Sequence, residues 1–161
     1  MFSFFKKKDD GIIIAAPVEG RAISITEVSD PTFGQCMLGK GIAILPEGDK
    51  VYSPVDGEIS FLFDTLHAVS ITSKEGVEIL IHVGLDTVGL KGDGFKAHVA
   101  TGDKVKKGDL LLTVDFKHIA DVGLQTVTPI VVCNTDDYKD VQEVCLGEVN
   151  ELDSILRIVT N

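Results

Sequence analysis

The sequence predicts an all-β protein, an antiparallel β sandwich or partly closed barrel with pseudo-duplicated halves and short helical turns. Two observations predict this fold class. Short segments rich in β-branched and aromatic residues alternate with clusters of glycine, proline and aspartate, and no stretch has the long apolar period of a helix. The 161 residues include 16 glycines, which suit many tight turns. The length fits one domain whose core needs neither disulfides nor metals.

The expected strands follow one another at close intervals, each bounded by turn-forming residues. One domain is therefore expected over residues 12–161, with short helical turns at His118–Leu124 and Asp136–Val141. The expected strands, in chain order, are Ile12–Ala15, Ala22–Ile25, Gly41–Leu45, Glu58–Phe63, Ala68–Thr72, Val77–Val83, Leu110–Val114 and Thr128–Cys133.

The first residues differ in character from the rest of the chain. An apolar tip, Met1–Phe5, is followed by three lysines, Lys6–Lys8. Weak contact with an anionic membrane is one interpretation, but so short a tip favours a flexible tail over residues 1–11. A signal peptide would carry its lysines before the apolar run, and no apolar stretch is long enough to span a bilayer. A cytoplasmic protein is therefore expected.

Net charge and cysteine usage exclude some kinds of partner and site. The formal net charge of −10 would repel nucleic acid and attract a basic protein. The cysteines, Cys36, Cys133 and Cys145, form no C-x-x-C pair. They are expected to be buried structural thiols. No cofactor is expected.

Two weak internal echoes indicate duplicated halves. Ala16–Ile23 resembles Ser53–Ser60, each with a P-V-[DE]-G turn. Glu47–Val51 likewise resembles Thr101–Val105, each with a G-D-K-V turn. The two pairs together predict a pseudo-symmetric sandwich.

His67 and His82 flank a predicted hairpin whose turn ends at Gly76. If the strands fold about the Lys74–Glu75 bond, His67 stands directly opposite His82. Opposed side chains have Cβ atoms roughly 4.5–5.5 Å apart, and Thr65, two residues earlier, points to the same face. The sequence therefore predicts a cluster of one threonine and two histidines. A shift of one residue in the register would separate the two rings.

Two imidazoles beside a hydroxyl fit three interpretations. A neutral imidazole is a nucleophile near pH 7, and the second ring can donate a hydrogen bond to the oxygens of a transferred phosphoryl group. Thr65 would then fix the tautomer of the second ring. His67 and His82 would alternatively bind zinc, although zinc normally takes three or four protein ligands and Glu78 is the only carboxylate on that face of the hairpin. The third interpretation is two unrelated surface histidines.

Three segments form a specific motif around the pair: Leu66–Val69, Glu78–Val88 and Lys91–Phe95. Together they resemble the glucose-type IIA family of the bacterial sugar phosphotransferase system. The resemblance covers nearly everything from about Ile12 to the end of the chain. Its further segments are Asp30–Phe33, Gly39–Ile44, Val51–Gly57, Val105–Asp109 and Thr128–Pro129.

The resemblance implies a phosphotransferase relay on an antiparallel β sandwich. In this relay the carrier protein HPr gives its phosphoryl group to a IIA histidine, and a cysteine of the IIB domain of a sugar permease takes it during sugar uptake. By resemblance the phosphorylated histidine is His82, the auxiliary histidine is His67, and the threonine bonded to the auxiliary ring is Thr65. Regulatory proteins are further possible partners. The implied partner-binding positions are the apolar Phe33, Met37, Leu38, Phe63, Leu80 and Val88 and the acidic Asp30 and Asp86.

Two rival functions are weaker. A zinc peptidase of the β-rich class needs an H-x-H ligand pair, whereas His82 is followed by Val83–Gly84. A biotinyl- or lipoyl-type carrier is indicated by Gly102–Gly108, but no M-K-M or D-K-A motif supplies its lysine. One departure from the family concerns Leu80, which stands where some relatives carry phenylalanine. An apolar contact of different shape is expected there.

Overall fold

The computed structural model describes residues 11–161, so the predicted tail, apart from Gly11, lies outside the described residues. The helices of the described chain are α2 (Pro31–Gly34) and α3 (Phe116–Asp121), with 3-10 turns η1 (Ile25–Glu27), η2 (Thr87–Leu90) and η3 (Thr135–Asp137). None of these helices is long and apolar enough to cross a membrane. The strands are β1 (Ile12–Ala15), β2 (Gly20–Ser24), β3 (Lys40–Pro46), β4 (Lys50–Tyr52), β5 (Gly57–Leu62), β6 (Ala68–Ser73), β7 (Glu78–His82), β8 (Phe95–Ala97), β9 (Lys104–Val105), β10 (Leu110–Val114), β11 (Thr128–Val132), β12 (Asp140–Glu143), β13 (Gly147–Val149) and β14 (Ser154–Val159).

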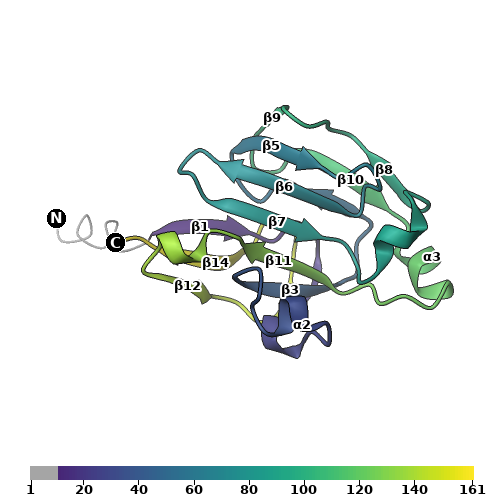
Figure 1. The fold of residues 1–161 in the computed structure, drawn as a ribbon, viewed down its shortest axis with the longest axis horizontal. Coiled ribbons are helices and arrows are strands. Elements are labelled where there is room, and N and C mark those ends of the chain that lie inside the picture. The colour runs from purple at the N-terminus through teal and green to yellow at the C-terminus, as the bar shows by residue number, and fades with distance from the viewer. Residues whose placement is uncertain (1–10) are drawn as a thin grey trace.

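The strands form antiparallel sheets that pack as a sandwich, which confirms the predicted fold class (Figure 1). Eight strands make one large sheet in the order β13-β2-β3-β11-β7-β6-β5-β9, and two smaller sheets have the orders β1-β14-β12 and β4-β10-β8. The core lies between the sheets and contains fully buried residues of each, among them Ile81, Ile130, Ile155 and Leu111. Within residues 11–161 none of these sheets closes into a barrel.

All eight predicted strands are present, two with the predicted ends and six with shifted ends, but six further strands of residues 11–161 were not predicted. Most of these are short, such as β9 with its two residues. The longer β14 buries Ile155, Leu156 and Ile158 without a strict alternation. The helical turn predicted at Asp136–Val141 is wrong beyond η3, because its end belongs to β12, which pairs with β14. The other predicted turn is confirmed as α3.

The hairpin of β6 and β7 differs by one residue from the predicted register. Ala68, and not His67, stands opposite His82. The reason lies at the tip, where Gly76 has a φ of 93° and its N–H donates to the Ser73 carbonyl at 2.9 Å. A turn followed by a left-handed glycine makes a three-residue loop, whereas the prediction assumed a loop centred on a peptide bond.

The two segments of the first internal echo are neighbours in the structure. The backbones of Ala15–Pro17 and Tyr52–Pro54 lie side by side and exchange two hydrogen bonds of 2.7 and 3.2 Å. The second echo does not correspond to a repeat. Lys50 in β4 pairs with β10, whereas Lys104 in β9 pairs with β5, so the similar turns occupy different environments.

The cysteines are less buried than predicted. Cys133 is exposed, and Cys36 and Cys145 are half-buried; all three are free thiols. Cys133 continues an apolar run in the sequence, but β11 already ends at Val132 and the chain turns toward the surface there. Burial of the adjacent strand therefore does not extend to the thiol.

Candidate functional site

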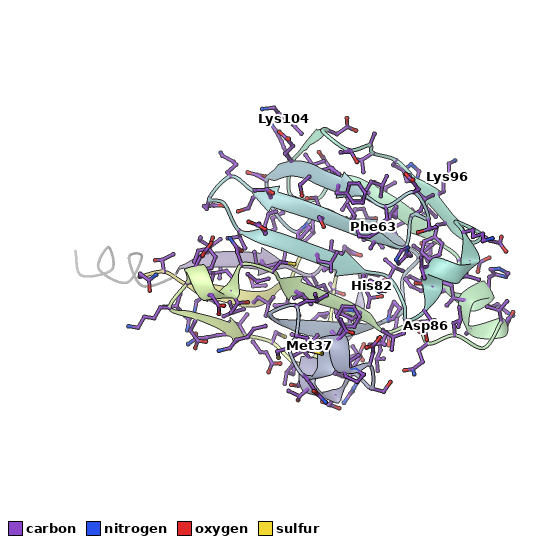
Figure 2. All side chains as sticks on the ribbon, viewed as in Figure 1. Met37, Phe63, His82, Asp86, Lys96 and Lys104 are labelled. Carbon is purple, nitrogen blue, oxygen red and sulfur yellow. The ribbon has the colours of Figure 1, made fainter. Side chains whose placement is uncertain are left out.

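The two histidines meet on the outward face of the large sheet. His82 is the last residue of β7, which lies between β6 and β11, and His67 comes directly before β6. The centroids of the two rings are 4.9 Å apart and their planes make an angle of 79°. Figure 2 shows His82 near the middle of this face, with Phe63 on one side and Met37 and Asp86 on the other.

His67 reaches His82 despite the shifted register, because it lies outside the regular strand. The preceding Leu66 has a left-handed φ of 61°, and its N–H donates to the Phe63 carbonyl at 2.8 Å. This tight turn interrupts the alternation of side chains and directs the His67 ring toward His82. The predicted pair is therefore present, although the strand pairing that predicted it is not.

A hydrogen bond to the backbone fixes the tautomer of neutral His82. Its Nδ1 lies 2.7 Å from the carbonyl oxygen of Gly84. A carbonyl only accepts hydrogen bonds, so Nδ1 carries the proton and Nε2 of the neutral ring carries the lone pair. The Phe33 ring packs beside His82, with centroids 5.0 Å apart and an angle of 53° between the planes. His82 is thus a half-buried ring with a defined orientation.

His67 is held by a side chain instead. Its Nδ1 lies 2.6 Å from the hydroxyl oxygen of Thr65, which places the predicted third member of the cluster beside it. His67 is 4% exposed, and Phe63 packs edge-on against its ring with centroids 5.4 Å apart. The His67 side chain is therefore less exposed than that of His82.

Both imidazoles are neutral at physiological pH. Burial and, to a smaller extent, the charge of the neighbouring His82 together lower the pKa of His67 to about 4. Burial also lowers the pKa of His82, while the hydrogen bond to Gly84 and the carboxylates of Asp30 and Asp86 partly oppose this shift. The site is therefore a neutral nitrogen nucleophile beside a second neutral ring.

Three of the predicted apolar contact residues are exposed. Met37, Leu38 and Val88 are 69%, 41% and 54% exposed. Phe63 is half-buried, and Phe61, which was not among the predicted contact residues, is 49% exposed with its ring 4.9 Å from that of Phe63. Exposed apolar side chains that cluster are typical of a surface that binds another protein.

Phe33 and Leu80, two other predicted contact residues, are buried at 4% and 9% exposure. They offer little surface of their own, and Phe33 instead packs beside the His82 ring.

The predicted acidic residues, Asp30 and Asp86, line one small pocket of about 240 Å³. The Asp30 carboxylate also accepts from the Thr32 N–H at 2.9 Å and caps α2.

The site is an open surface and not a cleft for a small substrate. A pocket of about 810 Å³ lies near β5 and β9, but its lining includes neither histidine. Across residues 11–161 no group of three or more His, Cys, Asp or Glu side chains is placed to hold a metal. His67 and His82 alone would supply two of the three or four ligands that zinc normally takes.

Sequence reasoning missed Gly84 and Phe61. Gly84 contributes through its carbonyl, and its φ of 76° explains why glycine follows the histidine at that spacing. The signal for Phe61 was available, because Phe61 and Phe63 are two residues apart in a predicted strand and therefore share a face.

Comparisons with known proteins agree on one family. Residues 12–138 match the family described as the phosphoenolpyruvate-dependent sugar phosphotransferase system, EIIA 1. The glucose-specific EIIA component of Oceanobacillus iheyensis is 42% identical over 149 residues, which cover 92% of this chain and 90% of that protein. The β-glucoside-specific EIIBCA component of Bacillus subtilis is 43% identical over 91% of this chain, which spans only 24% of that longer protein. The solved structure of glucose permease IIA from Mycoplasma capricolum has a TM-score of 0.85 and 40% identity, covering 90% of this chain and 94% of its own.

Proposed function

The chain belongs to the EIIA 1 family of the phosphoenolpyruvate-dependent sugar phosphotransferase system, and we propose that His82 is the residue that carries its phosphoryl group. The protein is a phosphocarrier of this system, and its family works with HPr and with IIB domains. In the proposed reaction the P–N bond of phosphorylated HPr breaks as a new bond forms from phosphorus to Nε2 of His82. A IIB cysteine thiolate then attacks the phosphorus, forming a P–S bond as the bond to His82 breaks.

The hydrogen bond between His82 and Gly84 carries this proposal. It keeps the proton on Nδ1, so the lone pair that must bond to phosphorus is on Nε2. Burial lowers the pKa of His82, so the nucleophilic neutral form dominates at neutral pH. The half-buried ring lies on an open face, where a partner protein can approach it.

His67 and Thr65 support the transfer without bonding to phosphorus. When the Thr65 hydroxyl donates to Nδ1 of His67, the single ring proton lies on Nε2. That N–H is a donor for the phosphoryl oxygens, whose charge is redistributed in the transition state. Burial lowers the pKa of His67 to about 4, so this ring stays neutral and its tautomer stays fixed.

The surface around the pair is the proposed docking site for both protein partners. Met37, Leu38 and Val88 supply exposed apolar contacts, and Phe63 extends them beside His67. Asp30 and Asp86 supply negative charge at the rim, which favours the approach of a basic partner. One surface serves HPr and the IIB domain in turn, because both must bring their reacting atom to the same nitrogen.

The proposed setting is the cytoplasmic side of a sugar permease. Relatives that match this chain over most of both lengths are named glucose-specific components, as in Oceanobacillus iheyensis and Bacillus cereus. A permease for glucose or a glucose derivative is therefore the proposed recipient. Complementation of sugar uptake in cells with defined permeases would identify the sugar.

Labelling with radioactive phosphoenolpyruvate, enzyme I and HPr tests the function. The wild-type protein should take up label, His82→Ala should remain unlabelled, and His98→Ala should be labelled as fully as the wild type. His98 is a suitable control because it is an exposed histidine outside the proposed site, where its Nε2 is hydrogen-bonded to the Thr113 hydroxyl at 2.8 Å. Full labelling of His82→Ala would disprove the assignment.

A second experiment separates the roles of the two rings. Acceptance from HPr exchanges nitrogen for nitrogen, whereas donation to a IIB cysteine exchanges nitrogen for sulfur and should depend more on the auxiliary donor. Loss of such a donor lowers rates by roughly 10²–10³. Quench-flow should therefore show that His67→Gln accepts from HPr but transfers poorly to IIB, and that Thr65→Ala shows a milder defect. Equal losses in both half-reactions, or none, would contradict this role.

A further inference from the structure

The backbone after His82 turns sharply through two left-handed residues. Gly84 has a φ of 76° and Asp86 a φ of 61°. This turn brings the Gly84 carbonyl back to Nδ1 of His82. Peptide units are rigid and planar, so the direction of that carbonyl depends on the two peptide planes that flank Gly84. The groups that hold these planes therefore orient the His82 ring.

One plane is held by the main chain and the other by a side chain. The Leu85 N–H shares its peptide unit with the Gly84 carbonyl, and it donates to the Gln125 carbonyl at 3.0 Å. The Val83 carbonyl belongs to the preceding unit, and it accepts from the Thr87 hydroxyl at 2.6 Å. Thr87 is fully buried, so this hydrogen bond is shielded from solvent.

The methyl group of Thr87 restricts the same turn. A Cβ atom placed on Gly84 would lie 2.6 Å from Cγ2 of Thr87 and 2.9 Å from the Gln125 carbonyl oxygen. Gly84 is thus enclosed by the same two residues that hold its peptide planes. Thr87 acts on the turn through both its hydroxyl and its methyl group, and it has no direct bond to His82 among its hydrogen bonds.

We infer that Thr87 is a positioning residue for phosphoryl transfer, which acts through the Val83–Gly84 peptide to keep the His82 proton on Nδ1 and the lone pair on Nε2. The inference rests on the proposed function, because it concerns the nitrogen of His82 that accepts phosphorus. When the Gly84 carbonyl is free to turn away, Nδ1 loses its acceptor and the proton can move to Nε2. A ring protonated there has no lone pair at the reacting nitrogen.

The test uses two substitutions that separate the hydroxyl from the shape of the side chain. Thr87→Val keeps the shape and removes the donor, whereas Thr87→Ser keeps the donor. Thr135→Val is the control, because the Thr135 hydroxyl also donates to a main-chain carbonyl, that of Val132 at 2.6 Å, after β11, and in addition accepts from the Lys40 N–H at 3.0 Å. Nitrogen-15 NMR of the unphosphorylated proteins at pH 8 reports the tautomer of His82, and chemical unfolding reports stability.

We expect Thr87→Val to increase the Nε2-protonated fraction of His82, while Thr87→Ser and Thr135→Val keep the wild-type tautomer. For Thr87→Val, kcat for phosphoryl acceptance from HPr should fall about tenfold, because one hydrogen bond is lost and its free energy corresponds to a rate change of this size. The KM for HPr should stay within about twofold of the wild-type value. If Thr87→Val does not fold, Thr87→Cys, a weaker donor of similar volume, should shift the tautomer in the same direction.

A wild-type tautomer in Thr87→Val, whatever its stability or rate, would overturn the inference. The tautomer is measured without phosphorylation, so this result is independent of the proposed function. If the proposed function is wrong, the wild-type protein would instead carry its phosphoryl label on a residue other than His82.

Discussion

The two histidines are proposed to have different tasks because their surroundings differ. His82 is half-buried and donates from Nδ1 to a main-chain carbonyl, which leaves Nε2 as a nucleophile. His67 is almost fully buried beside the Thr65 hydroxyl, which suits a neutral hydrogen-bond donor. The sequence predicted both residues and their meeting. It could not predict the Gly84 carbonyl or the Thr87 hydroxyl, because main-chain direction after a strand depends on tertiary contacts such as that with Gln125.

The depressed pKa of His67 makes stability depend on pH. The unfolded ring titrates near 6.5 and the folded ring at about 4, so between these values only the unfolded state binds the proton. Stability from this residue is therefore complete above about pH 6.5 and falls as pH drops toward 4. As pH falls over that range, the wild type should lose up to about 3 kcal/mol of unfolding free energy relative to His67→Gln, which lacks the titrating ring. Urea unfolding at several pH values measures it, and a constant difference would contradict the shift.

At the scale of elements, composition predicted where the strands lie but not the detailed geometry of their turns. Segments rich in β-branched and aromatic residues, bounded by turn-forming residues, predicted the eight strands that build most of the sandwich. The register of the β6–β7 hairpin was wrong because Gly76 adds a left-handed residue at the tip. The rings still meet because Leu66 adopts a second left-handed conformation before β6. Neither conformation has a reliable signal in a single sequence, least of all at leucine.

The tip of this hairpin gives a prediction about stability. Gly76 has a φ of 93°, and a Cβ atom added to it would meet no heavy atom within 4 Å, so Gly76→Ala introduces backbone strain without a clash. We expect it to destabilise the fold by about 1 kcal/mol. Gly89→Ala is the control, because Gly89 is equally open but lacks a positive φ, and it should change stability by less than about 0.5 kcal/mol. Equal effects of the two substitutions on the urea midpoint would refute the strain argument.

At the scale of the whole molecule, the proposed docking surface, apolar with carboxylates at its rim, belongs to an acidic protein. The formal net charge of −10 attracts a basic partner over distances of about a Debye length, roughly 8–10 Å near physiological ionic strength. The carboxylates of Asp30 and Asp86 are close enough to His82 to act on its charge, so they would also attract a basic partner that approaches this residue. The charge was predictable from composition, whereas the burial of Phe33 and Leu80 beneath the surface was not.

Neutralising the rim should slow association with HPr. Asp30→Asn keeps a side chain that can cap α2, and Asp86→Asn keeps a residue that tolerates the left-handed φ. We expect each to lower kcat/KM for phosphorylation severalfold at low salt and to weaken its salt dependence. Glu151→Gln, exposed in the loop after the edge strand β13, removes the same charge elsewhere and should have little effect. Stopped-flow rates across a salt series measure these differences, and rates that do not respond to salt would rule out steering.

The central claim is that Nε2 of His82 bonds to phosphorus. The direct measurement is NMR of the protein labelled with nitrogen-15 in its histidines and phosphorylated through HPr. We expect a phosphorus–nitrogen coupling to Nε2 of His82, while Nδ1 keeps its proton and donates it in the hydrogen bond to the Gly84 carbonyl. A phosphoryl group on Nδ1 of His82, on His67 or on any other residue would contradict it.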